Sequence, residues 1–453
     1  MNRYAYKMNR YADKMSRYAY KMNRCADKIN GNRKQRGRET ICFSLKTCYN
    51  ITMKLKFFVF FLIFSIFPSS VSAERFVYKY VPGAKYRILS IVNEDVYIDR
   101  QLSHTSEIVN RIAIEITNVN DKTATNKAIF QTGEKALFVS ARNDGFQWDK
   151  DYESVFERDK FGYMTIDKQY FMPIVRNVPV FPDRNLKEGD VWDAEGHEMH
   201  DFRSSFGIEE PYRIPFTASY KFLGEKEWKN KQYPAFSISY HIFTEPLAVS
   251  GDIYPICIMG TSDQIVYWDA ESGEPAAYTE NFRMIFELSN GRTFEFRGTA
   301  TAEVLKSESM NKQDILEQIN RDIEDLGIKD AYAKVIDEGI SISLENIQFK
   351  PDSADLISSE KEKLDKIGAI LKKFQDRDIL VEGHTAYSGS EESMLQLSEE
   401  RAGAVTNHLL EHDVRAPERI ITRGYGGAKP VADNSTEVGR IKNRRVEITI
   451  LEN

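Results

Sequence analysis

Cysteine is scarce in this 453-residue chain, which holds four, and three of them, Cys25, Cys42 and Cys48, lie in the first 50 residues. The rest of the chain has Cys257 alone and can form no internal disulfide, so its stability must come from the packing of its cores. Cys257 stands in the apolar run IYPICI. Such a setting favours a buried, inert thiol over a reactive one.

Long apolar runs are also missing. A membrane-spanning helix needs about 20 apolar residues in succession, and no run in this chain is that long. The apolar run at 57–67 follows Lys54 and Lys56 and precedes the small residues VSA at 71–73. A basic flank, a short apolar run and a small-residue cleavage site make up a secretory signal peptide. We therefore expect residues 53–73 to be a cleaved signal peptide and the mature chain to be exported, with no transmembrane helix. The residue directly after the cleavage site is Glu74 and not a cysteine, which argues against lipoprotein processing.

A seven-residue repeat precedes this segment, with Met1, Met8, Met15 and Met22 in step. Such a repeat could form a basic amphipathic helix or a coiled coil. A signal peptide, however, is read only at the start of a chain. We therefore expect translation to start at Met53 and residues 1–52 to be untranslated or unstructured.

Basic residues are in deficit once this leader is set aside. Residues 1–73 hold 15 Lys and Arg against three Asp and Glu, so the other 380 residues hold 47 and 65, a formal net charge of −18. Neutralising the phosphates of a nucleic acid requires a basic surface. The sequence therefore predicts no nucleic-acid partner.

Catalytic signatures are absent as well: the chain has no Gly-rich phosphate loop and no nucleophile elbow. The candidate metal ligands are His197 and His200, with Asp201 beside them. A catalytic zinc needs a third ligand and an open position, and the sequence points to none, so we interpret these residues as polar turn residues. We expect neither enzymatic activity nor a cofactor.

Residues 74–306 show the period-two alternation that is typical of strands. Ile112, Ile114 and Ile116 alternate with more polar neighbours, and Asn290-Gly291 is a hairpin-turn signal because both residues tolerate positive φ. Strands that cross a membrane should carry a continuous apolar band. Charged residues interrupt nearly every run here, so we expect a soluble, antiparallel β-rich region.

A proline-rich stretch at 172–183 interrupts this pattern and either divides the region into domains at 74–180 and 181–306 or forms a loop within one domain. Four tryptophans could line a ligand groove but are more typical of a β core; they are Trp148, Trp192, Trp228 and Trp268.

Helical periodicity begins with Ile315, Ile319 and Ile323, which predict an amphipathic helix from Asn311 to Leu326. Within the segment 307–330 this helix is either a connector or a helix docked on its own domain.

The last part of the chain alternates strands with helices, which predicts a two-layer α/β sandwich and makes the chain α+β overall. Ser359 to Glu362 predicts the capping box of one helix, and Ser398, followed by two glutamates, the N-cap of a second. We expect His408 and His412, on this second helix, to face solvent.

Five segments of this part stand in the order and spacing of the OmpA-like, peptidoglycan-associating domain family, which residues 331–453 therefore resemble. These segments are NIQFKPDSADL (346–356), VEGHT (381–385), LSEERAGAV (397–405), ITRGYGGAKPVADN (421–434) and GRIKNRRVEI (439–448). The resemblance implies nothing for residues 74–306.

In that family the domain clamps the free diamino-acid end of a peptidoglycan stem peptide, a zwitterion that needs one anionic and one cationic partner. The family motif places an Asp directly after GHT and an Arg fifteen residues later. Here Arg401 is present, Ala386 replaces the Asp, and Met394 replaces an Asn eight residues beyond it. The pocket residues implied by the resemblance are Thr385, Ala386, Met394, Leu397, Ser398, Arg401 and Arg445.

The resemblance is compatible with two functions. The replacements at Ala386 and Met394 distinguish them, because only the first function needs the glycopeptide site. The first is an exported tether at the peptidoglycan or outer membrane of a two-membrane bacterium, with an incomplete clamp, for which Glu391 or Glu392 could supply the carboxylate. The second is an interaction or scaffold module that has lost the glycopeptide site and contacts other envelope proteins. An envelope enzyme working through the middle region is a third, remote alternative.

Overall fold

The computed structural model describes residues 73–136, 145–149, 151–206, 210–245, 253–306, 310–345, 347–349, 354–387 and 389–452. The repeat at 1–52 and the expected signal peptide, apart from Ala73, lie outside these ranges. No helix in the described part of the chain is long and apolar enough to cross a membrane.

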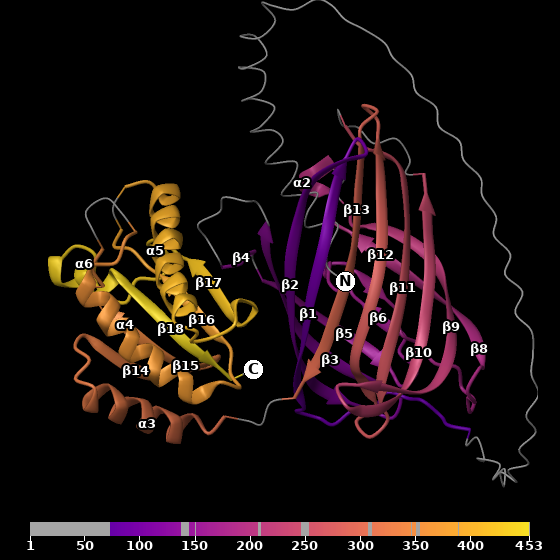
Figure 1. The fold of residues 1–453 in the computed structure, drawn as a ribbon, viewed down its shortest axis with the longest axis horizontal. Coiled ribbons are helices and arrows are strands. Elements are labelled where there is room, and N and C mark those ends of the chain that lie inside the picture. The colour runs from indigo at the N-terminus through magenta and orange to yellow at the C-terminus, as the bar shows by residue number, and fades with distance from the viewer. Residues whose placement is uncertain are drawn as a thin grey trace, which may run out of the picture.

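Residues 85–305 form one large antiparallel sheet, which is the tall, curved body in Figure 1. Its strands follow the order β6-β5-β3-β2-β1-β13-β12-β11-β10-β9-β8-β7, with β4 paired to β3. Because β1 pairs with both β2 and β13, the first and last strands are neighbours. The bounds are β1 Lys85–Ile98, β2 Gln101–Val119, β3 Thr123–Ala136, β4 Gln147–Trp148, β5 Tyr152–Asp159, β6 Met164–Ile166, β7 Val175–Arg176, β8 Val191–His200, β9 Tyr212–Trp228, β10 Lys231–Thr244, β11 Pro255–Asp269, β12 Glu274–Leu288 and β13 Thr293–Leu305, with the short helix α2 at Arg203–Phe206.

The alternation that predicted these strands is visible in their burial. Ile114 and Ile116 are buried, whereas Ala113 and Thr117 are exposed. The hairpin expected at Asn290-Gly291 joins β12 to β13. Only the glycine has a positive φ, of 79°.

The segments 74–180 and 181–306 share this sheet and one apolar core, as in the one-domain alternative. The proline-rich stretch between them does not form a surface loop throughout, because Met172, Ile174 and Val180 are buried in that core. We refer to the whole as the β-rich domain.

A second, aromatic cluster forms around Trp268, whose side chain is 1% exposed. Its ring meets those of Tyr78 and Phe181 edge-on, with centroids 5.0 and 4.7 Å apart. Trp192 is partly buried and packs against the cluster. Two of the four tryptophans therefore belong to the core, as the alternative to a ligand groove predicted.

The C-terminal domain has a five-stranded sheet in the order β14-β15-β18-β16-β17, and helices cover one face of it (Figure 1). The expected two-layer sandwich and the α+β class are confirmed. Bounds are α3 Lys312–Asp325, β14 Ala331–Ile336, β15 Gly339–Glu345, α4 Ser358–Leu371, η1 Lys372–Phe374, β16 Ile379–Gly383, α5 Glu391–Glu411, η2 Pro417–Arg419, β17 Ile420–Gly424, α6 Glu437–Asn443 and β18 Arg445–Leu451.

Helix α3 is docked on its own domain. Ile319 and Ile323 are buried in the C-terminal core, and the helix packs against β14 and β15. The docked alternative for 307–330 is therefore the one that the structure supports.

Two predicted helix starts are wrong. Helix α5 begins at Glu391, where the side chain of Ser390 accepts a hydrogen bond from the Ser393 backbone N–H, so Ser398 lies inside the helix. Ser390 and Ser398 both precede two glutamates, which makes the local signal ambiguous. Helix α4 begins one residue before the predicted capping box, at Ser358, without a side-chain cap.

The two domains are joined by a buried carboxylate. Asp378, just before β16, is 1% exposed and accepts hydrogen bonds from Arg87 of β1 and Arg111 of β2, and from Arg419 of its own domain with the Nε atom at 2.7 Å. We call this set the Asp378 cluster. Nearby, Trp148 of β4 donates its indole N–H to the carbonyl of Ile420 at 3.0 Å.

Candidate functional site

The candidate site lies where the chain leaves β16 and passes beneath α5. A Cβ atom on Gly383 would lie 2.2 Å from the carbonyl oxygen of Ser398, so glycine is needed for α5 to approach the sheet. The backbone N–H of Thr385 donates to the carbonyl of Gly426 at 2.9 Å, and the N–H of Gly426 donates to Ser398 Oγ at 2.8 Å. The buried serine thus fixes the loop that follows β17 to α5, and the Thr385 contact fixes the same loop to the one that follows β16.

The predicted residues Ala386 and Met394 form an apolar floor beside these contacts. Ala386 is 7% exposed and Met394 is 4% exposed. Met394 packs against the glycines at 426 and 427, where added Cβ atoms would approach its side chain to within 3.5 Å. Tyr387, 60% exposed, marks the outer edge of the loop.

Arg401 is held without an anionic partner among the described residues. Its guanidinium lies over the ring of Phe349, 4.9 Å from the centroid, and its Nε atom is buried with no hydrogen-bond partner. Burial lowers the pKa of Arg401, and the positive charge of Arg444 lowers it further. The side chain stays protonated at neutral pH, so it is a cation prepared for a carboxylate.

Glu391 and Glu392 do not take the place of the missing carboxylate. They precede Arg401 by ten and nine residues on the same helix, which corresponds to a rise of roughly 14–15 Å at 1.5 Å per residue. The amine and carboxylate of one α-carbon are only a few bonds apart, so their partners must lie side by side. Both glutamates are also exposed at the first turn of α5.

Further polar atoms of this loop are buried without partners among the described residues. They are Nδ1 and Nε2 of His384 and Oγ1 of Thr385. Burial, followed by the charge of Arg445, lowers the pKa of His384 to about 3, and its ring stacks on Tyr425. His384 is therefore neutral at physiological pH, and three unpartnered atoms adjoin the position of Ala386. Buried polar groups in native proteins are rarely left in this state.

Two other predicted residues have different places. Arg445 is 3% exposed and serves the fold, because its Nε atom donates to Glu447 at 2.8 Å and its carbonyl accepts from the His384 N–H. Leu397 is half-buried on α5.

Sequence reasoning missed the role of Asn434 as a support for the loop. Its side-chain oxygen accepts from the Tyr387 N–H and from the Asn443 amide, at 3.1 and 2.9 Å. The only available signal was its place within the family segment 421–434.

The candidate metal pair His197 and His200 is not brought together. Both lie in β8 rather than in a turn, three residues apart, so their side chains point to opposite faces of the sheet. His200 is fully buried and pairs with Glu198 at 2.7 Å. Burial, then Arg213 and Arg176, lowers the pKa of His197 to about 4.

Comparison with known proteins gives a match for the C-terminal domain. The model of the OmpA family matches residues 348–444. The chain is 39% identical over 104 residues to the peptidoglycan-binding protein ArfA of Mycobacterium tuberculosis (strain H37Rv), covering 23% of this chain and 32% of that protein. It is 37% identical over 105 residues to the probable lipoprotein YiaD of Escherichia coli K12, covering 23% and 48%.

The chain thus spans less than half the length of these curated relatives. Among solved structures, an outer membrane protein of Borrelia burgdorferi B31 is 38% identical, with 27% of this chain and 96% of that chain covered and a TM-score of 0.23.

Proposed function

We propose that this chain, whose C-terminal domain is an OmpA-like domain, is an exported envelope protein that holds its β-rich domain at the peptidoglycan. Its place would be the periplasm, or the periplasmic side of the outer membrane, of a two-membrane bacterium. Support comes from the matched relatives, one of which is called a peptidoglycan-binding protein, and from the geometry around Arg401.

The observation that carries the proposal is the half-buried guanidinium of Arg401, for which the described residues supply no anionic partner. A carboxylate from a stem peptide can accept a bidentate pair of hydrogen bonds from this group. The loop atoms of His384 and Thr385 that find no partner in the described part of the chain supply further hydrogen-bonding positions. The amine of the same ligand would meet Ala386, which offers it no charge.

Half of a charge clamp implies weak binding. A hydrogen bond to a charged group contributes about 1.5–3 kcal/mol, which corresponds to roughly tenfold to more than hundredfold in affinity. We expect Ala386→Asp combined with Met394→Asn to tighten binding to purified sacculi by that factor, and Arg401→Ala to abolish it. The measurement is co-sedimentation of the mature chain, residues 74–453, over a range of sacculus concentrations.

The matched control is Lys361→Ala, which removes an exposed cation on α4 away from the site and should leave binding unchanged. Melting temperatures of all variants identify any that are unfolded. Equal binding by the unmodified chain and by Arg401→Ala would contradict a role for the guanidinium.

A second candidate is an interaction module that uses this fold without peptidoglycan. The observation in its favour is the apolar floor of Ala386 and Met394, both buried. If only the restored double variant pellets with sacculi, this second candidate replaces the first. The remote enzyme alternative depended on His197 and His200, and their opposed orientation gives it no support.

A further inference from the structure

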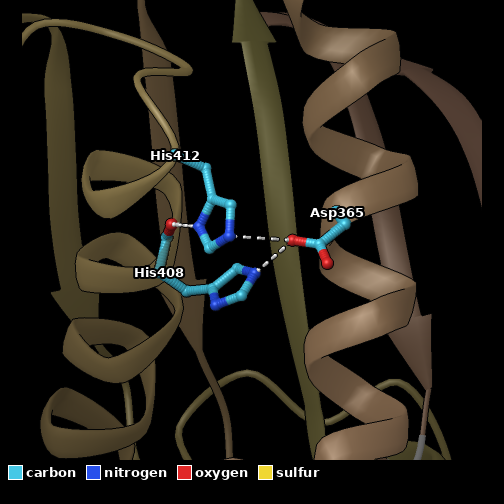
Figure 2. A group of neighbouring side chains, drawn as sticks. All are labelled: Asp365, His408 and His412. Carbon is cyan, nitrogen blue, oxygen red and sulfur yellow. Dashed lines mark hydrogen bonds and ion pairs between the residues drawn. The ribbon is translucent and has the colours of Figure 1, made fainter.

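Three side chains outside the candidate site converge between α4 and α5. His408 and His412 lie one turn apart on α5, and Asp365 faces them from α4 (Figure 2). The expectation that both histidines face solvent is wrong for His408, which is 5% exposed. It is buried because α4 packs over it and supplies the carboxylate.

The contacts of the three side chains are close. His408 Nε2 lies 2.8 Å and His412 Nε2 lies 3.4 Å from the same oxygen, Asp365 Oδ1. The two imidazole rings are 4.3 Å apart between centroids. One ligand atom from each residue can be chosen so that all three lie within 4.8 Å of one another.

The tautomer of His412 is fixed by its second hydrogen bond. Nδ1 lies 2.8 Å from the carbonyl oxygen of His408, and a carbonyl can only accept, so Nδ1 carries the proton. In neutral His412, Nε2 then presents a lone pair to the negatively charged Asp365 oxygen. Two acceptors facing each other repel, and a cation between them removes the repulsion.

A divalent transition metal fits this arrangement. Zinc binds His nitrogen and Asp oxygen at about 2.0–2.2 Å, which places tetrahedral ligand atoms roughly 3.4 Å apart. The distances between the candidate ligand atoms of the three residues run from 2.8 Å to at most 4.8 Å, on either side of that value. Small side-chain rotations are therefore enough to bring the three atoms to the spacing that zinc needs. A histidine ligand that donates its other N–H to a backbone carbonyl is also the usual outer arrangement of zinc sites.

We propose that Asp365, His408 and His412 bind one Zn²⁺ ion, which links α4 to α5. Both Asp365 and His412 are about half-exposed, so the ion can enter from solvent and keep water in its remaining position. This site uses none of the residues of the Arg401 pocket and does not depend on the proposed function.

The test is zinc titration of the tag-free mature chain after treatment with a chelator. We expect one equivalent bound per chain, measured by calorimetry and by metal content after gel filtration, with a higher melting temperature. His412→Ala should weaken binding by more than about tenfold, which is the loss expected from even an outer partner. His412 is suited to this test because its removal leaves no buried cavity.

His241→Ala is the matched control, since His241 is an exposed histidine on β10, and it should bind zinc as the unmodified chain does. Zinc binding by His412→Ala with unchanged stoichiometry and affinity would overturn the proposal. So would an unmodified chain that takes up no zinc at micromolar concentrations.

Discussion

Replacing Asp378 with asparagine should lower the free energy of unfolding of residues 74–453 by about 3–5 kcal/mol, the range for removing one partner of a buried ion pair. The carboxylate is 1% exposed, and Arg87 and Arg111 are each 3% exposed. Asparagine has no charge to offset these guanidinium groups, which would stay buried. Burial already lowers the pKa of Arg87 to about 10, against the opposing effect of Asp378.

The measurement is denaturant unfolding followed by circular dichroism, with Asp376→Asn as the matched control. Asp376 lies two residues away with a side chain 72% exposed, and it pairs with Arg377, whose side chain is 8% exposed. Because solvent screens the exposed carboxylate of Asp376, we expect its loss to cost at most about 1 kcal/mol. Equal effects of the two substitutions would contradict the role assigned to the Asp378 cluster.

The same prediction has a pH dependence of known sign. Burial raises the pKa of Asp378, but the charges of Arg111, Arg87 and Arg419 outweigh it, so the pKa lies below its ordinary value. A carboxyl group whose pKa is lowered by folding stabilises the folded state at every pH above its ordinary pKa. This stabilisation is lost as the pH falls through the pKa that the group has in the folded chain. The difference between the unmodified chain and Asp378→Asn should therefore be full at neutral pH and shrink in acid.

Trp268→Ala should destabilise the β-rich domain by about 3–5 kcal/mol, as large-to-small changes of buried aromatic residues do. The side chain is 1% exposed and meets Tyr78 and Phe181 edge-on. Aromatic pairs of this geometry add about 0.5–1.5 kcal/mol beyond the area they bury. The substitution removes these contacts and leaves a cavity that the surrounding rings cannot fill completely.

Trp228→Ala is the control for this experiment. Trp228 ends β9 and is only partly buried, with its ring 5.0 Å from that of Tyr267. Substitutions away from a core usually change stability by less than about 0.5 kcal/mol, and the lost ring contact adds a similar amount. A loss for Trp228→Ala as large as that for Trp268→Ala would show that the cluster does not dominate the stability of the domain.

Local periodicity was sufficient to predict the β-rich region, the helix α3 and the layers of the C-terminal domain. It could not predict that the β-rich region is one sheet, because that depends on β1 pairing with β13 across about 200 residues of chain. The prediction of where α5 begins was wrong for a different reason. Ser390 and Ser398 carry the same local signal, and only the burial of Met394 and Ser398, on the inner face of α5, decides between them.

The candidate site was predicted in part. The family motif located Arg401 and the substitution at Ala386. The structure adds the buried atoms of His384 and Thr385 that have no hydrogen-bond partner within the described ranges. The Asp378 cluster gave no sequence signal. Arginines in a strand are expected to face solvent. Arg87 and Arg111 are buried because Asp378 of the C-terminal domain lies against them.

The pairing of β1 with β13 determines how the β-rich domain responds to force. The ladder runs from Arg87↔Leu305 to Ile98↔Phe294, so the start of β1 and the end of β13 lie side by side at the same end of the pair. A force applied between residues 84 and 306 would break the hydrogen bonds between β1 and β13 one residue pair at a time. It would not load all of these bonds at once, as a shearing force does. The β1–β13 pair would therefore open gradually under a load applied between these two residues.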